Sequence, residues 1–297
     1  MRLPVLAAVA AVTFLSGTSV TAGGKPEPVT SVTLAKSWAA AIEEAKLLNV
    51  PIVVHSHGFY CGPCWGMHSA VMCNKKYIDF ANENTVEVIS LDRLEEGIEK
   101  KDKRAETYEA KVDGKTVNYF VEFPGMTAED MAACKNSKAS SYNNTGKIPY
   151  TCIVDPYTES EIAHWQGGTG AGTIQDAVLE AKKALVKDHG KGTARKDLKV
   201  LADADKDAQA KVAKGDFTAA IEALAKVNAK ADKWSDGLKE QLKADKQKII
   251  DAAQAALDKI VEVKATDAEK AKKDLTALAP KLKGTGLEDK VKELLSQ

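Results

Sequence analysis

The 297-residue chain has no excess of charge and, beyond its first residues, no long apolar run. Its 42 basic residues balance 42 acidic residues, which leaves no electrostatic pull on a nucleic acid or an anionic membrane. A membrane-spanning helix needs roughly 20 consecutive apolar residues, and no later segment supplies them. We therefore expect no nucleic-acid partner and no membrane anchor.

Cysteine and histidine are missing from the last third of the chain. All five cysteines precede residue 153, and residues 191–297 contain neither residue type and only two aromatic residues, Phe217 and Trp234. Apolar residues recur in this stretch at helical spacing beneath charged faces, which predicts an all-α domain over 191–297, a helical bundle or hairpin domain. Because it lacks a thiol and a group that titrates near neutrality, we expect it to dock a client or a second copy, with the chemistry in the preceding residues.

The first 22 residues have the features of an export signal. Arg2 supplies a positive charge, residues 5–15 an apolar core too short to span a bilayer, and residues 20–22 a small-residue cleavage site. We expect a signal peptide over 1–22, a linker over 23–33 and a secreted protein located in the periplasm. An uncleaved membrane tether is the alternative.

Two cysteines, with two residues between them, follow an apolar run. The unbroken β-branched run in 51–55 predicts a strand buried on both faces of a sheet. Cys61 is then expected at the start of the next helix, where free backbone amides favour a thiolate, with Cys64 one turn later. A disulfide that closes so short a loop stabilises a fold little, so we predict a redox couple and no metal site. Metal capture with His57 and His68 is the alternative.

The motif Cys61-Gly62-Pro63-Cys64 is identical to the active-site tetrapeptide of thioredoxin, and residues 147–155 resemble the Ile-Pro-Thr strand of that family. The resemblance implies an α/β thioredoxin fold over 34–188, a central mixed sheet flanked by helices. It also implies a cis peptide bond at Pro149, placed against the disulfide.

The resemblance further implies an extracytoplasmic thiol-disulfide oxidoreductase that exchanges disulfides with protein substrates and needs no cofactor. Cys61 would attack, Cys64 would resolve the mixed disulfide, and Pro149 would complete the catalytic site. Partners would be protein thiols or disulfides and an unidentified redox donor or acceptor. The residues expected to bind substrate are Tyr60, Gly62, Pro63, Trp65 and Ile148. A thioredoxin-like adaptor acting through its helical domain, or a metal-binding chaperone, is the alternative function.

Three positions depart from the thioredoxin pattern. His55 stands where the family has a buried acid, His57 stands at a tryptophan position, and Trp65 replaces a basic residue after the motif. We expect His55 and His57 to tune the pKa of the pair, and a protonated His57 would favour the Cys61 thiolate. His55 would either replace the missing acid or fill the core.

An insertion over about 93–146 separates the two halves of the resemblance. Alternating residues in 108–112 and 116–121 around Asp113-Gly114 predict a β-hairpin, and Thr127 with Asp130 predicts a helix start. This insertion would either overhang the disulfide and select substrates or only decorate the fold.

Further elements are predicted after the insertion. Residues 161–166 are expected as the last strand, and Thr173 with Asp176 as the cap of a closing helix that reaches about 187. Cys152 is expected to be buried. The sequence does not decide whether Cys73 and Cys134 form a disulfide.

Overall fold

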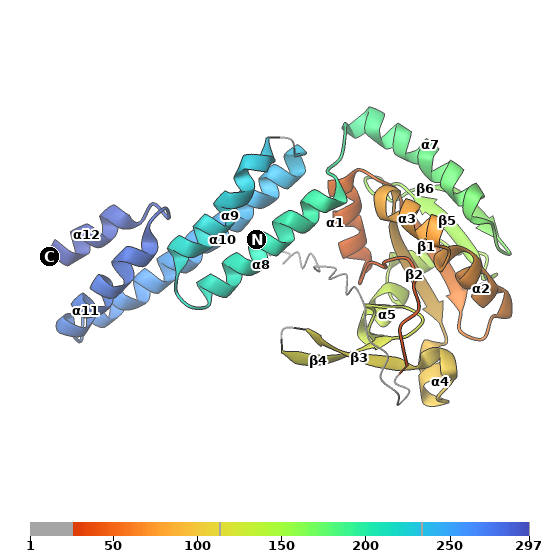
Figure 1. The fold of residues 1–297 in the computed structure, drawn as a ribbon, viewed down its shortest axis with the longest axis horizontal. Coiled ribbons are helices and arrows are strands. Elements are labelled where there is room, and N and C mark those ends of the chain that lie inside the picture. The colour runs from red at the N-terminus through yellow and green to blue at the C-terminus, as the bar shows by residue number, and fades with distance from the viewer. Residues whose placement is uncertain (1–25, 113, 233, 297) are drawn as a thin grey trace. The chain divides into compact units, whose positions relative to one another are not determined.

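The computed structural model describes residues 26–296 apart from 113 and 233, and the chain divides into two compact units between Arg195 and Lys196 (Figure 1). The predicted signal peptide lies outside the described residues, as do residues 23–25 of the predicted linker. Within the described residues, none of the helices combines the length and the apolar character needed to cross a bilayer.

A four-stranded mixed sheet with the order β2-β1-β5-β6 forms the centre of the first unit. Strand β1 (Ile52–Gly58) runs parallel to β2 (Val86–Asp92) and antiparallel to β5 (Tyr150–Val154), which pairs antiparallel with β6 (Glu161–Gln166). Every residue of β1 and β5 is buried. The prediction of a strand buried on both faces at 51–55 is confirmed.

Helices cover this sheet. Helices α1 (Trp38–Leu48) and α5 (Ala128–Lys135) pack against β2, whereas α7 (Ala171–His189) packs against β5 and against α3 (Lys75–Asn84). The first unit is therefore an α/β structure in which a mixed sheet is flanked by helices.

The insertion contains the predicted hairpin and helix. Strands β3 (Thr107–Val112) and β4 (Lys115–Phe120) pair antiparallel as a separate two-stranded sheet, and residue 113 of their turn lies outside the described residues. Helix α5 begins after Thr127, whose side chain forms the predicted capping box with Asp130. Three short helices complete the insertion: α4 (Leu94–Glu99), the 3-10 helix η2 (Lys103–Ala105) and α6 (Lys138–Ser141).

The predicted cap of the closing helix is wrong. Helix α7 begins at Ala171, two residues before Thr173, and its N-cap is Gly170, which makes no side-chain cap hydrogen bond. Gly170 is already in the extended conformation of an N-cap residue, so the first helical turn forms before Thr173 and places that residue inside the helix.

The second unit is helical, as the sequence predicts. Its elements are α8 (Arg195–Val212, which begins at the boundary), α9 (Phe217–Ala231), α10 (Asp236–Lys264), α11 (Ala268–Leu278), the 3-10 helix η3 (Ala279–Leu282) and α12 (Glu288–Ser296). Helices α9 and α11 both pack against α10. The helical spacing of apolar residues predicted in this stretch is seen in α10, where Leu238, Leu242, Ile249, Ala253 and Leu257 are buried.

The chain that follows α7 is fastened to the first unit. The Thr193 N–H donates to the Leu47 carbonyl at 3.0 Å. Arg195 donates to the backbone carbonyls of Asn82 at 2.9 Å and Thr85 at 2.6 Å, and it pairs with Glu44. The segment up to Arg195 therefore belongs to the first unit.

Candidate redox site

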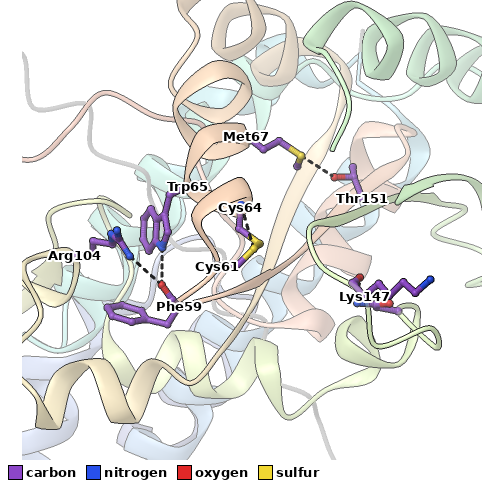
Figure 2. Close-up of a disulfide and its surroundings, with 9 residues drawn as sticks. Phe59, Cys61, Cys64, Trp65, Met67, Arg104, Lys147 and Thr151 are labelled. Carbon is purple, nitrogen blue, oxygen red and sulfur yellow. Dashed lines mark hydrogen bonds between the residues drawn. A yellow bond between two sulfur atoms is a disulfide. The ribbon is translucent and has the colours of Figure 1, made fainter. Parts of the chain in front are cut away.

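Cys61 and Cys64 form a disulfide at the junction of β1 and helix α2 (Gly62–Met67), with 5.2 Å between their Cα atoms (Figure 2). Cys61 is the N-cap residue of α2, and its Sγ accepts a hydrogen bond from the Cys64 backbone N–H at 3.2 Å. Cys61 is half-buried, whereas Cys64 is only 1% exposed. The disulfide therefore presents the Cys61 side to solvent and shields Cys64.

The Ile148–Pro149 segment lies beside this pair. Its peptide bond is cis, Pro149 is buried, and Ile148 is 37% exposed. A Cβ on Gly58 would lie 2.3 Å from Ile148 Cδ1 and 3.5 Å from Cys61 Cβ. Ile148 thus packs against Gly58 next to the cysteine loop, and the absence of a side chain at Gly58 makes room for it. The structure brings these segments together from positions almost 90 residues apart.

The other predicted substrate-binding residues differ in accessibility. Gly62 and Pro63 are exposed, and Tyr60 is 40% exposed with the Arg93 guanidinium 5.5 Å from its ring centroid. Trp65 is half-buried and donates its indole N–H to the Phe59 carbonyl at 2.7 Å. Tyr60, Gly62 and Pro63 are therefore open to a substrate, while Trp65 is engaged in packing; substrate binding by all of them stays a prediction.

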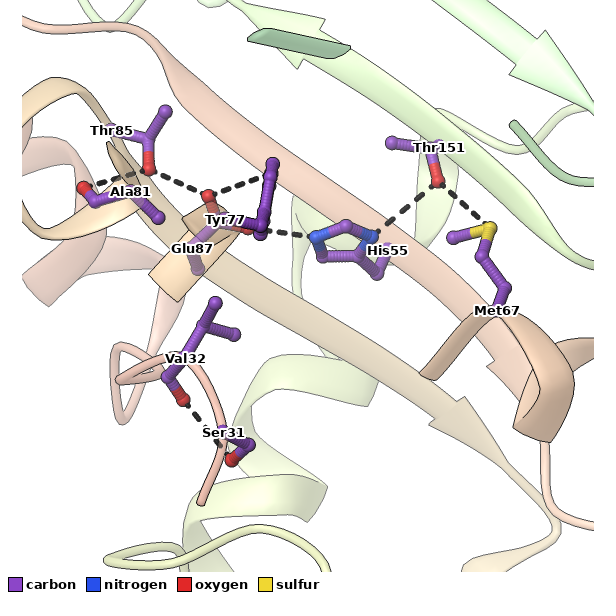
Figure 3. Close-up of polar contacts among 9 residues, drawn as sticks. All are labelled: Ser31, Val32, His55, Met67, Tyr77, Ala81, Thr85, Glu87 and Thr151. Atoms are coloured by element: carbon purple, nitrogen blue, oxygen red, sulfur yellow. Dashed lines mark hydrogen bonds and ion pairs between the residues drawn. The ribbon is translucent and has the colours of Figure 1, made fainter. Parts of the chain in front are cut away.

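His55 is fully buried and is held by a carboxylate that sequence reasoning missed (Figure 3). Its Nε2 lies 2.7 Å from Glu87 Oε2 on β2, and its Nδ1 lies 3.4 Å from Thr151 Oγ1. Glu87 Oε1 accepts hydrogen bonds from Tyr77 at 3.1 Å and Thr85 at 2.6 Å. Burial, reinforced by Glu87, raises the pKa of Tyr77 well above its usual value.

The acidic residue of this network, Glu87, lies on β2, whereas β1 contributes His55. Glu87 is 2% exposed, so His55, Tyr77 and Thr85 take the place of water as hydrogen-bond partners of its carboxyl group. The available signal was a glutamate in the otherwise apolar stretch 86–89, because a charged residue in a buried strand needs a partner.

The expectation of a protonated His57 is wrong. His57 is 3% exposed, and burial, with smaller contributions from His55 and His68, lowers its pKa well below the usual value. His68, the first residue of the π-helix η1 (His68–Met72), is 1% exposed, and burial followed by the charge of His55 lowers its pKa to about 4. His57 Nε2 and His68 Nδ1 have no hydrogen-bond partner among the described residues. Both imidazoles are therefore neutral near pH 7.

Acidification below pH 6.5 should destabilise the fold through His68 and His57. The unfolded chain protonates each imidazole near 6.5, whereas folded His68 has a pKa of about 4 and that of His57 is also lowered. The unfolded state binds more protons in this window, so stability is complete above it and falls as the pH drops toward 4, by on the order of 3 kcal/mol for His68. Urea unfolding at steps across the window measures this loss.

Two variants isolate the contribution of His68. His68→Phe should flatten the pH dependence, whereas His164→Phe on β6, where the side chain is 54% exposed, should not. Glu122 has the opposite effect on the pH dependence of stability. Its carboxylate lies 3.4 Å from His68 and burial raises its pKa, so the folded state binds this proton at a higher pH than the unfolded state does. An unchanged slope in His68→Phe would contradict the assignment.

The remaining three cysteines are free thiols, so the disulfide left open between Cys73 and Cys134 is not formed. Burial, with a smaller contribution from nearby carboxylates, raises the pKa of Cys73 to about 11 and that of Cys134 to about 12. Cys152 is buried in β5, as predicted, and burial raises its pKa as well. In the described part of the chain, no group of three or more His, Cys, Asp or Glu residues is arranged to hold a metal ion.

Comparison with known proteins adds only weak structural likeness. No family model matches the chain, and no curated protein matches it. A solved structure described as "DsbH Oxidoreductase" is 18% identical, covers 57% of this chain and 95% of its own, and superposes with a TM-score of 0.33. A likeness at this level establishes neither fold nor activity, so the functional assignment must come from the geometry of the site.

Proposed function

We propose that the first unit is a thioredoxin-fold thiol-disulfide oxidoreductase that exchanges disulfides with protein substrates outside the cytoplasm. Support for the fold comes from the order β2-β1-β5-β6, with β1 and β2 parallel and the other pairs antiparallel, and from the cysteine pair at the end of β1. The export prediction for residues 1–22 supports the location. The observation that carries the activity is the unequal exposure of the two sulfurs beside Ile148–Pro149.

The chemistry follows from that inequality. In the reducing direction, the Cys61 thiolate attacks a substrate disulfide, forms a mixed disulfide and releases the first substrate thiolate, which takes a proton from solvent. Cys64 then loses its proton and attacks Cys61 Sγ, which releases the second substrate thiolate and closes the Cys61–Cys64 disulfide. Two electrons pass from the protein to the substrate. Oxidation of a substrate dithiol is the same sequence reversed.

The cis Ile148–Pro149 segment would guide the substrate. Ile148 and Tyr60 are exposed apolar side chains near Cys61, and an extended peptide bearing a cysteine would lie against them. The electron donor or acceptor in the cell would be a second protein with a thiol pair, because the described residues offer only one redox-active pair.

Exchange with a model protein disulfide tests this proposal. The reduced protein should reduce the model disulfide and the oxidised protein should oxidise a dithiol peptide, with one disulfide exchanged per chain. The matched control is Cys73→Ser, which removes a half-buried free thiol and should leave both rates unchanged. Failure of exchange in both directions would favour the adaptor function.

The helical unit would serve as a docking or pairing module with no part in electron transfer. A chain that ends after Lys196 should exchange disulfides with a small substrate at the full-length rate, while its rate with the natural protein partner or its oligomeric state in solution changes. Size-exclusion chromatography and exchange assays on both chains measure this. Loss of small-substrate exchange in a folded truncated chain would contradict it.

A second truncation provides the control for stability. A chain that ends after Lys187 also loses Thr193 and Arg195 and leaves the carbonyls of Leu47 and Thr85 without these donors. The neutral hydrogen bond of Thr193 contributes about 0.5 to 1.5 kcal/mol and the charge-assisted bond of Arg195 about 1.5 to 3 kcal/mol, so its free energy of unfolding should fall by about 3 kcal/mol relative to the longer truncation.

A further inference from the structure

We propose that Arg104 of the insertion is a positioning residue of the redox site: it holds the loop that carries Cys61 and contributes a positive charge that favours the Cys61 thiolate. This inference deepens the proposed function and rests on it. It assigns to the inserted segment a part in the chemistry of the cysteine pair.

The contacts of the Phe59 carbonyl carry the proposal. This oxygen, two residues before Cys61, accepts one hydrogen bond from Trp65 Nε1 at 2.7 Å and a second from Arg104 Nη1 at 3.3 Å (Figure 2). The Arg104 guanidinium carbon also lies 5.2 Å from the centroid of the Trp65 ring, a cation–π contact. Arg104 thus contacts both Phe59, two residues before Cys61, and Trp65, the residue directly after Cys64.

The insertion holds Arg104 and Phe59 in place. The backbone N–H of Arg104 donates to Asp102 Oδ1 at 2.9 Å, which caps the short helix η2. The ring of Phe59 is fully buried, and a Cβ on Gly97 would lie only 2.3 Å from it, so the two surfaces are in direct contact. These contacts hold the backbone of Arg104 and the residue that carries its acceptor, and the guanidinium is positioned by its own contacts with the Phe59 carbonyl and the Trp65 ring.

Phe123, also from the insertion, contacts the Trp65 ring. It is 1% exposed, and its ring centroid lies 5.8 Å from Trp65 and 4.9 Å from His68. The indole therefore contacts both a cation and an aromatic ring, and Arg104 itself is half-buried. A charge in such a partly dry place acts over a longer distance than one in bulk water.

Other charged groups near the site do not cancel the positive charge of Arg104. Arg93 and Lys100 lie over Tyr60, and Glu96, which pairs with both, offsets only one of these two positive charges. Lys147, next to Ile148, adds an exposed positive charge near the disulfide (Figure 2). His57 and His68 are neutral, for the reasons given above. Glu122 is the opposing charge: its carboxylate is turned toward His68 Nε2 at 3.4 Å, and Arg104 and Lys103 lower its pKa against a larger effect of burial.

Substitutions in the full-length chain test the charge and the geometry separately. Arg104→Gln should raise the pKa of Cys61, read from the pH dependence of alkylation, by about 0.5 to 1 unit, because a cation near the thiolate is lost. The equilibrium with glutathione should shift about three- to tenfold toward the protein disulfide, where tenfold corresponds to about 30 mV. Arg104→Lys should restore most of the pKa, since it keeps the charge.

Two further variants provide the controls. Glu122→Gln removes the opposing charge and should shift the pKa of Cys61 downward, whereas Lys75→Gln on α3, where the side chain is 85% exposed, should leave it unchanged. A lower midpoint of unfolding in Arg104→Gln with the Cys61 pKa and glutathione equilibrium unchanged would overturn the inference and leave Arg104 a structural anchor only. The alkylation measurement needs no substrate, so failure of the proposed exchange activity is distinguished from failure of this inference.

Discussion

Replacing Cys61 with serine should reduce disulfide exchange by about 1,000-fold or more, because the attacking sulfur is lost and a hydroxyl does not substitute for a thiolate. Cys64→Ser should behave differently. Its Cys61 remains able to attack, but nothing resolves the mixed disulfide, so a covalent adduct with the substrate should accumulate. The asymmetry follows from the structure, in which Cys64 is only 1% exposed while Cys61 is half-buried.

Non-reducing electrophoresis of both variants measures this asymmetry. The Cys64→Ser adduct should disappear on reduction and should be absent from Cys61→Ser, and mass spectrometry of the trapped protein would identify the substrate. Cys73→Ser serves as the control because that thiol has a pKa raised to about 11 and does not pair. Adducts formed by Cys61→Ser and not by Cys64→Ser would contradict the assigned roles.

Glu87→Ala should lower the free energy of unfolding by about 2 to 6 kcal/mol, because each of two buried groups loses its hydrogen-bond partner at a cost of about 1 to 3 kcal/mol. The substitution would leave His55 Nε2 and the Tyr77 hydroxyl without their acceptor in a dry core. It also removes the carboxyl group that connects Tyr77 of α3 to His55 of β1 (Figure 3). Urea unfolding of the oxidised protein measures the loss.

Two substitutions calibrate this effect. Glu109→Ala removes an exposed glutamate on strand β3 and should change stability by no more than about 0.5 kcal/mol. Tyr77→Phe removes one donor to Glu87 and should cost about 1.5 to 3 kcal/mol, as for a hydrogen bond to a charged group. If Glu87→Ala matched Glu109→Ala, the network around His55 would not contribute to stability.

Local sequence patterns were sufficient for the elements that form from their own residues. The hairpin of 107–120 follows from alternation around a turn, and α5 follows from the capping box of Thr127 and Asp130. The N-cap of α7 was predicted wrongly because no local side-chain pattern marks it. Its first turn is fixed by the backbone of Gly170, and a glycine gives no side-chain signal for an N-cap.

The parts of the site that depend on tertiary contacts were not predictable from the sequence. Glu87 reaches His55 only because β1 and β2 pair in parallel with Val53 opposite Glu87, a register that no local pattern specifies. The burial of His57 decides its protonation, and burial depends on how the whole first unit packs. Arg104 meets the Phe59 carbonyl across 45 positions of sequence, through an insertion whose path the pattern leaves open.

The midpoint potential of the Cys61–Cys64 pair tests the central claim, a reversible redox couple, most directly. Equilibration with glutathione buffers, followed by alkylation and quantification of the reduced fraction, gives this value. Because the backbone amide of Cys64 and the charge of Arg104 favour a Cys61 thiolate, we expect a midpoint above thioredoxin's value of about −270 mV. A more negative midpoint, and above all one below about −300 mV as in structural disulfides, would contradict it.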